Sequence, residues 1–250
     1  MNEMAVCDSP VAAEYIASPN HGERLGHRVP DAIILHYTGM ASERAALRRL
    51  CAPSSGVSAH YFVCECGRVV QMVPESRRAW HAGVGVWRGE QDLNSASIGI
   101  EIANVGHDGG LPPFNSDQIL ALIGLCRDVV RRLAIAPERV LGHSDIAPAR
   151  KRDPGERFPW KRLAQSGVGH WIPPAPLLGP SRFKLGDTDP QIRLLQEQLA
   201  AYGYGVNITG QYDSQTLIVL TAFQRRFRPA RVDGEPDEST IETLKALLRL

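Results

Sequence analysis

The chain has 250 residues, of which 43% are hydrophobic and 22% are charged, as is typical of a globular protein with one large or two modest domains. The formal net charge of +1 argues against a polyanion-binding surface, so we expect no nucleic-acid partner. Because no apolar run approaches the roughly 18 residues that a membrane-spanning helix needs, we expect no membrane-spanning segment.

The first twenty residues contain no basic stretch and no continuous apolar segment, which predicts that there is no secretory signal peptide. The five cysteines are an odd number without regular spacing, which is more typical of reduced thiols than of a disulfide framework. Both observations predict a cytoplasmic protein, with a periplasmic or exported protein as the alternative. Cys64 and Cys66 have the wrong spacing for a usual zinc pair, so no second metal site is expected there.

Up to about residue 170 the pattern alternates between strands and helices. Short apolar or alternating runs predict strands at residues 32–37, 60–65, 68–73, 97–104 and 139–142. Ser42 and Ser116 are suitable N-caps for helices that end near Leu50 and Leu133. The mixture predicts an α/β fold, with a mixed central β-sheet flanked by helices.

Four prolines between residues 170 and 182 mark a stiff linker, after which only helical patterns follow. Three helices are expected there, with Asp237 capping the last and Asp213 or Ser214 capping the second. A domain of about 65 residues is only marginally stable alone. The predicted organisation is a catalytic domain at residues 1–170, a Pro-rich linker at 171–182 and a small three-helix domain at 183–250.

The segment GHSDIAPARKRDPG, residues 142–155, holds the densest group of reactive side chains, and such loops often carry function on a rigid scaffold. His143 follows a strand end, where sites in sheet proteins tend to lie. Histidine and aspartate are zinc ligands, and zinc with fewer than four protein ligands keeps a position open for water. Asp153 is a candidate ligand or a turn-capping residue, whereas Asp145 either competes as a ligand or anchors the loop backbone.

Glu101 stands within the apolar run SIGIEIAN. An isolated buried carboxylate costs several kcal/mol unless it is paired or neutralised, so a functional role is favoured. Strand alternation places Gly99, Glu101 and Ala103 on one face, and the two small residues would leave room for a substrate. The alternative is a structural salt bridge to Arg150 or Arg152.

His36 ends an apolar strand and is either a core histidine with a hydrogen-bond partner or a ligand that points into a cleft. Four further residues are candidates for substrate binding, with core packing or turn formation as the alternatives: Trp80, His81, Asn94 and Asn104. We expect a structural role for His60 and a surface position for His107.

Five motifs occur in order over about residues 30–165: LHYTGM, SAHYFV, AWHAGVGVW, SIGIEIAN and GHSDIAPARKRDPG. They resemble those of the bacterial zinc-dependent N-acetylmuramoyl-L-alanine amidases of type 2, a group that includes the peptidoglycan recognition proteins. The resemblance implies that His36, His143 and Asp153 bind one Zn²⁺ per chain, that Glu101 is the catalytic carboxylate and that Lys151 is the catalytic lysine. With its LGD, YGY, GQYD, AFQ and VDG segments, the C-terminal region resembles a peptidoglycan-binding domain.

The resemblance implies hydrolysis of the amide between the lactyl group of (anhydro)MurNAc and L-Ala of the stem peptide. Zinc would activate water and polarise the carbonyl, Glu101 would transfer protons and Lys151 would stabilise the oxyanion. The expected partners are peptidoglycan fragments (muropeptides), in cell-wall recycling, or peptidoglycan itself. One alternative is a lytic amidase that acts on intact peptidoglycan outside the cytoplasm, and another is a non-catalytic recognition protein. The C-terminal domain could also serve only to cover or shape the catalytic domain.

Overall fold

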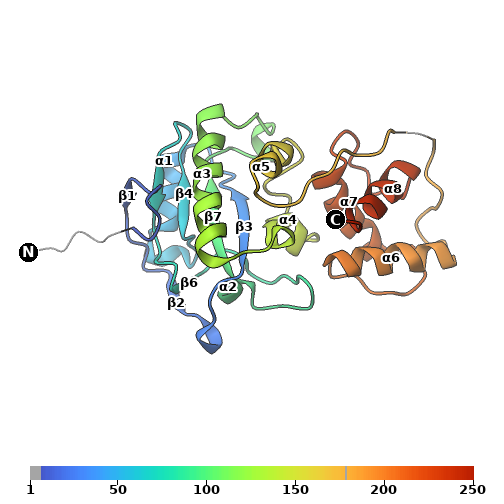
Figure 1. Ribbon diagram of the computed structural model, residues 1–250, viewed down its shortest axis with the longest axis horizontal. Coiled ribbons are helices and arrows are strands. Elements are labelled where there is room, and N and C mark those ends of the chain that lie inside the picture. Colours follow the sequence, from blue (N-terminus) through green and yellow to red (C-terminus); the bar gives the residue numbers. More distant parts are fainter. Residues whose placement is uncertain (1–6, 178) are drawn as a thin grey trace, which may run out of the picture.

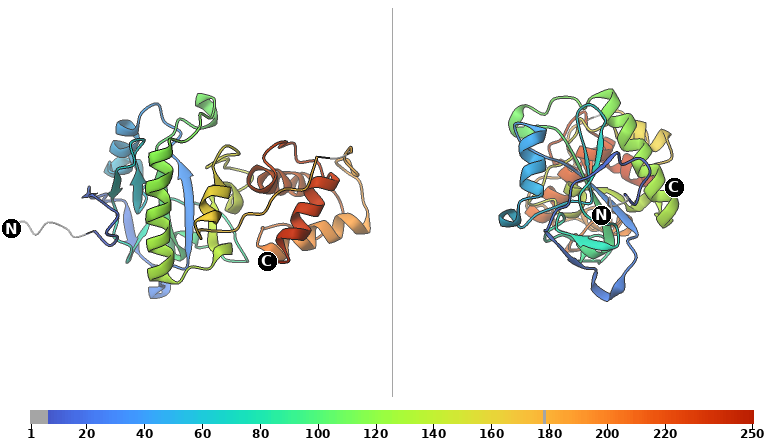
Figure 2. Two further views of the ribbon diagram at one scale, coloured as in Figure 1. Left: turned by 45° about the horizontal axis from the view of Figure 1, so that its top comes forward. Right: turned by 90° about the vertical axis from the view of Figure 1, so that its left-hand side faces the viewer.

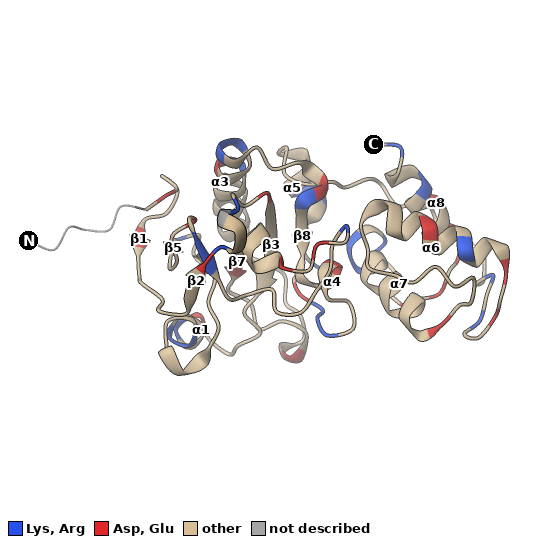
Figure 3. Cartoon of the chain, turned by 90° about the horizontal axis from the view of Figure 1, so that it is seen from below, with Lys and Arg blue, Asp and Glu red and all other residues tan. Residues whose placement is uncertain are grey.

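The computed structural model describes residues 7–177 and 179–250 (Figure 1). Residues 1–6, on which the signal-peptide prediction partly rests, lie outside the described residues, as does residue 178 of the predicted linker. Within the described residues, none of the helices combines the length and the apolar character that crossing a membrane would need. Basic and acidic residues are interspersed over the chain, which agrees with its low net charge (Figure 3).

A six-stranded mixed sheet forms the centre of the larger domain, in the order β1-β5-β4-β7-β3-β8. β4 and β5 pair antiparallel, and the other neighbours pair parallel. The strands are β1 (Glu14–Tyr15), β3 (Ala32–Tyr37), β4 (Tyr61–Val63), β5 (Val69–Gln71), β7 (Ser97–Ile102) and β8 (Val140–Gly142), and a separate antiparallel pair consists of β2 (His21–Glu23) and β6 (Arg77–Ala79). The predicted mixed sheet is therefore confirmed.

Eight helices are found in the described part of the chain: α1 (Glu43–Leu50), α2 (Leu93–Ala96), α3 (Ser116–Leu133), α4 (His143–Ile146), α5 (Trp160–Gln165), α6 (Pro190–Tyr202), α7 (Ser214–Phe227) and α8 (Glu238–Leu247). As predicted, Ser42 caps α1, since its side chain accepts a hydrogen bond from the backbone N–H of Ala45. The prediction that Ser116 caps α3 is wrong by one residue. Asn115 holds the extended N-cap position, and Ser116 is already the first residue of the helix.

The two faces of the sheet have different roles. On β3, Ile33 and Leu35 join the apolar cluster under α3, whereas Ile34 packs in the cluster on the opposite face. His36 shares that opposite face because side chains alternate along a strand. His36 is also the direct register partner of Glu101 on the neighbouring strand β7. α1 and α3 lie on opposite sides of the sheet (Figure 2), so the face that α3 leaves free can carry a site.

The C-terminal helices α6, α7 and α8 pack together and lie next to α4 of the larger domain (Figure 1). One apolar cluster crosses the boundary, because Trp87 and Ile146 of the larger domain belong to the same cluster as Tyr204, Phe223 and Phe227. Trp87 stands edge-on to Tyr204, with 5.0 Å between the ring centroids. The two parts of the chain are thus joined by a packed interface as well as by the linker.

Candidate metal centre and active site

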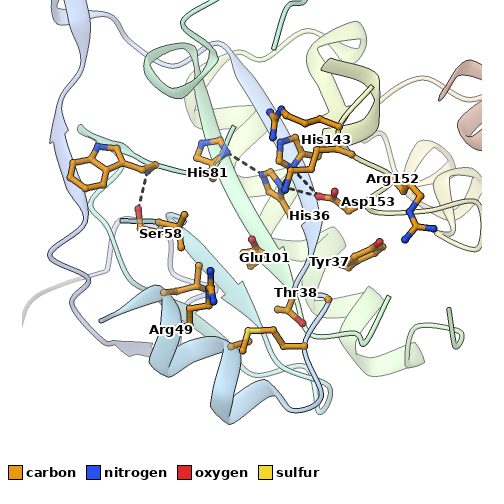
Figure 4. A pocket seen from close by; sticks show the side chains of 18 residues that line it. His36, Tyr37, Thr38, Arg49, Ser58, His81, Glu101, His143, Arg152 and Asp153 are labelled. Atoms are coloured by element: carbon orange, nitrogen blue, oxygen red, sulfur yellow. Dashed lines mark hydrogen bonds and ion pairs between the residues drawn. The ribbon is translucent and has the colours of Figure 1, made fainter. Parts of the chain in front are cut away.

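A cavity of about 500 Å³ lies on the sheet face opposite α3. Its walls come from β3, β7, α1 and the segment that follows β8. His36, His143 and Asp153 lie close together in it, with His81 and Glu101 nearby (Figure 4). Seven residues singled out from the sequence line it: His36, Trp80, His81, Glu101, His143, Lys151 and Asp153. Folding therefore brings together groups that are up to 117 positions apart in the chain.

Three buried side chains form the tightest polar cluster in this cavity. His36 Nδ1 lies 2.8 Å from His143 Nδ1 and 3.1 Å from Asp153 Oδ2, and His143 Nδ1 lies 3.0 Å from the same oxygen. The exposed fractions of the three residues are 2%, 2% and 6%. Among the described residues this is the group whose donor atoms could hold a metal ion.

Both rings direct Nδ1 toward this cluster and have a further partner at Nε2. The Nε2 atom of His143 lies 2.9 Å from the carbonyl oxygen of Ala82, an acceptor that requires the proton to be on Nε2. The Nε2 atom of His36 lies 3.1 Å from Nδ1 of His81. Outer-sphere contacts of this kind are those that fix the tautomer and orientation of metal-binding histidines.

The electrostatics of the cluster fit a cation. Burial and the neighbouring His143 lower the pKa of His36 to about 4, so this ring is neutral at pH 7. Burial alone would raise the pKa of Asp153, but the two histidines outweigh that effect and keep it well below its usual range. Two imidazole nitrogens and a carboxylate oxygen at such short distances are the donor set of a zinc site with room for a further ligand.

Asp145 is not part of this cluster, although it lies in the same loop. Its Oδ2 accepts a hydrogen bond from the backbone N–H of Gly142 at 2.8 Å. The structure therefore favours the loop-anchoring role for Asp145 and leaves Asp153 beside the two histidines.

Glu101 faces the cavity from β7 without the ion pair that was considered for it (Figure 4). Among the described residues, its Oε2 atom is buried and has no hydrogen-bond partner. Burial and the charge of Asp153 raise the pKa of Glu101 to about 8, against the opposing effect of Lys151. Arg150 instead donates to the carbonyl oxygens of Ala82 and Val84, and Arg152 pairs with Asp108.

The space predicted for a substrate beside Glu101 is partly filled by another side chain. Gly99 shares its face of the strand, but a Cβ atom at Gly99 would lie 2.4 Å from the ring of His81. The small residue therefore makes room for His81 and not for a substrate. His81 in turn contacts His36, so Gly99 is needed to make room for a neighbour of the His36–His143–Asp153 cluster.

Three further polar residues, Asn94, Asn104 and His60, hold the backbone around or beneath the cavity. Asn94 accepts hydrogen bonds from the backbone N–H groups of His81 and Ala82, and Asn104 donates to the carbonyl of Pro112, so both hold loops around the cavity without lining it. His60 is buried beneath the site and accepts from the N–H of Gly99, in agreement with a structural role.

The surface position predicted for His107 is wrong, because its side chain is only 13% exposed. Its Nδ1 lies 2.9 Å from the hydroxyl of Tyr37, and its Nε2 lies 3.0 Å from Glu156. A glycine-rich loop suggested exposure, but the contacts with Tyr37 and Glu156 leave the ring only partly exposed.

Other parts of the site were not predicted from the sequence. Tyr37, Thr38 and Arg49 also line the cavity. Tyr37 and Thr38 belong to the LHYTGM motif, but neither they nor Arg49 were singled out as site residues. Tyr204 and Arg226 reach Asp145 from the C-terminal helical region, which no local signal in either segment could indicate.

Comparison with known proteins agrees with this arrangement. A family model described as N-acetylmuramoyl-L-alanine amidase matches residues 26–156, and one described as a peptidoglycan binding domain matches residues 188–244. The N-acetylmuramoyl-L-alanine amidase AmiD of Escherichia coli (strain K12) is 40% identical over 234 residues, which cover 86% of this chain and 81% of that protein. The 1,6-anhydro-N-acetylmuramyl-L-alanine amidase AmpD of Enterobacter cloacae is 32% identical over 170 residues, 61% of this chain and 89% of that protein.

Two solved structures resemble nearly the whole chain. AmiD from E. coli in complex with the substrate anhydro-N-acetylmuramic acid-L-Ala-D-gamma-Glu-L-Lys has a TM-score of 0.75 and 37% identity, and covers 90% of this chain and 91% of its own. AmpDh3 from Pseudomonas aeruginosa in complex with anhydromuramic pentapeptide has a TM-score of 0.73 and 30% identity, and covers 98% of both chains. The family resemblance seen in the sequence is confirmed, and the chain belongs to the N-acetylmuramoyl-L-alanine amidases, with a C-terminal region of the peptidoglycan-binding type.

Proposed function

We propose that this enzyme hydrolyses the amide between the lactyl group of anhydro-N-acetylmuramic acid and L-Ala of the stem peptide, with soluble muropeptides as its substrates. The observation that carries the proposal is the His36–His143–Asp153 cluster, which shares one cavity with the unpaired carboxylate of Glu101. The substrates named for AmiD and AmpDh3 support anhydromuramyl peptides as the substrate class.

The two histidines and Asp153 are the residues that would hold one zinc ion per chain. Bound zinc would lower the pKa of water and polarise the scissile carbonyl. The protein's own contribution is to fix the tautomer of His143 through Ala82, to orient the ring of His36 through His81 and to keep the donor atoms buried. Loss of a hydrogen bond to the far nitrogen of a metal-binding imidazole commonly lowers metal affinity by 10–100-fold, and we expect an effect of about this size for the Ala82 contact.

Glu101 is the group that moves protons in this scheme. A carboxylate whose pKa is raised by burial can hold the proton taken from the attacking water and then pass it to the departing amine nitrogen. The Oε2 atom of Glu101 is available for this transfer because it has no hydrogen-bond partner among the described residues. Without this second transfer the amine would have to leave as an unstable anion. Because Glu101 then carries the proton taken from water, it can serve both steps.

Lys151 supplies positive charge beside the carbonyl oxygen, where negative charge develops. Lys151→Met should lower kcat by about 10²-fold with a smaller change in KM, because removal of one oxyanion-stabilising group costs about 10²–10³ in rate. Steady-state kinetics on a soluble anhydromuropeptide measure both constants. Lys161→Met is the matched control, since Lys161 lies on α5 over the ring of Trp171. A Lys151→Met variant with the kcat of the wild type would remove Lys151 from the mechanism.

We also propose the three-part organisation given above, with a catalytic domain at residues 1–170, a linker at 171–182 and a helical domain at 183–250. The family matches at residues 26–156 and 188–244 support this division. The match to a peptidoglycan binding domain favours a second candidate function, the cleavage of intact peptidoglycan at the cell wall.

Digestion of two substrates separates the two functions. We expect kcat/KM on anhydro-N-acetylmuramyl tripeptide to exceed kcat/KM per cleavable bond on purified sacculi by at least about tenfold, a difference of about 1.4 kcal/mol in transition-state binding. Chromatography with mass spectrometry measures the released stem peptide in both reactions. Strong release from sacculi with none from the soluble fragment would overturn the recycling proposal in favour of wall lysis. Cell fractionation tests the predicted cytoplasmic location separately.

A further inference from the structure

Asp145 is the most completely satisfied carboxylate beside the metal cluster. Its Oδ1 accepts from the hydroxyl of Tyr204 at 2.7 Å. Its Oδ2 accepts from the backbone N–H of Gly142 at 2.8 Å and from Nη1 of Arg226 at 2.7 Å. Asp145 is 1% exposed, and Tyr204 and Arg226 are each 2% exposed, so these bonds lie away from solvent.

Two of these three donors come from the C-terminal helical region. Arg226 lies on α7, and Tyr204 follows α6. The guanidinium of Arg226 also stacks on the ring of Trp160 at 4.1 Å and donates to the carbonyl oxygen of His170 at 3.3 Å. Arg226 is therefore inserted into the larger domain, and it contacts that domain at several separate points.

Asp145 connects these contacts to the metal cluster through the backbone. It lies in α4, the four-residue helix whose first residue is His143. The backbone N–H of Ser144, between them, donates to the carbonyl oxygen of Asp153 at 2.9 Å. A shift of α4 would therefore displace the ring of His143 and disturb the backbone that carries Asp153.

A buried ion pair is a poor source of net stability, because the cost of removing both charges from water offsets most of their attraction. The pair between Arg226 and Asp145 is better explained by a need to hold α4 in one position. Directional bonds from Tyr204, Arg226 and Gly142 hold the carboxylate of Asp145 in a single orientation. Nonpolar packing alone would allow α4 to slide.

We propose that the C-terminal helical domain is a structural part of the metal centre: Tyr204 and Arg226 are positioning residues that clamp Asp145 and thereby set His143 and Asp153 for metal binding. This inference rests on the proposed function, since it takes these residues to be zinc ligands. It gives the domain a role in catalysis on small soluble substrates, for which wall binding is not needed.

A pair of tyrosine variants tests the clamp. Tyr204→Phe removes only the hydroxyl that reaches Asp145, and Tyr212→Phe removes a hydroxyl that is equally buried but donates to Gly234 within the same domain. We expect Tyr204→Phe to weaken zinc binding by about 10-fold and to lower kcat, as outer-shell changes do. Tyr212→Phe should alter the melting temperature without a change in zinc affinity. Zinc affinity is measured by competition with a chromogenic chelator.

A second pair uses the buried arginines of α7. Arg226→Met should weaken zinc binding by about 10–100-fold. Arg228→Met should not, because the partners of Arg228 among the described residues, such as Thr240 and Asp237, lie within the helical domain. Equal zinc affinities for the four variants and the wild type would overturn the clamp. If Arg226→Met does not fold, the tyrosine pair still decides. A wild-type protein that binds no zinc would contradict the proposed function instead, so the two failures are distinguishable.

Discussion

Glu101→Gln should lower kcat by about 10³-fold on a soluble anhydromuropeptide while the protein still binds zinc. Proton transfer by a positioned side chain typically contributes 10²–10⁴ to the rate, and glutamine cannot accept the proton of water. The substitution keeps the size of the side chain and leaves the three clustered donors in place. The expected result is therefore loss of turnover with the metal content and the fold retained.

Two measurements separate this outcome from general damage. Metal analysis should give the same zinc content as in the wild type, and Glu65→Gln, in the exposed turn between β4 and β5, should keep the wild-type kcat. Full activity of Glu101→Gln on muropeptides would show that the unpaired carboxylate has no catalytic role.

His36→Ala should abolish zinc binding and reduce activity to the background. Two of the three donor atoms would remain, His143 Nδ1 and Asp153 Oδ2, too few for a stable site. A metal ion supplies several kcal/mol of transition-state stabilisation, so its loss should lower kcat by at least about 10³-fold. Atomic emission or a chelator assay measures zinc per chain.

His21→Ala is the matched control for this experiment. His21 lies on β2 in the small second sheet and contacts Arg77, away from the metal cluster. Its replacement should leave the zinc content near that of the wild type. A His36→Ala variant that retains one zinc per chain and its activity would require another set of ligands.

The sequence is most informative where one element determines its own structure. Continuous apolar runs predicted β3 and β7, and apolar residues at helical spacing predicted α3. Both patterns can be read from the residues of the segment itself. The ligand set was implied by the family resemblance, but the meeting of the two histidines has a related local origin. His36 and His143 each follow a run that fixes them at a strand end, and parallel pairing of β3 with β8 then brings the ends together.

What could not be predicted depends on contacts between distant segments. From the sequence, Gly99 suggests an open space for a substrate, but in the structure the ring of His81 fills that space. Asp145 has the same local pattern whether it binds a metal or anchors the loop, and the choice depends on Tyr204 and Arg226, 59 and 81 residues away. The burial of His107 likewise depends on partners from other loops.

Titration of the metal-free enzyme with zinc, while the release of stem peptide from anhydro-N-acetylmuramyl tripeptide is followed by mass spectrometry, tests the account most directly. Activity should rise linearly and stop rising at one equivalent of zinc per chain. The product should be an intact peptide with a free L-Ala amino group. Full activity without metal, a break at another stoichiometry, or cleavage of a different bond would contradict a one-zinc amidase built on His36, His143 and Asp153.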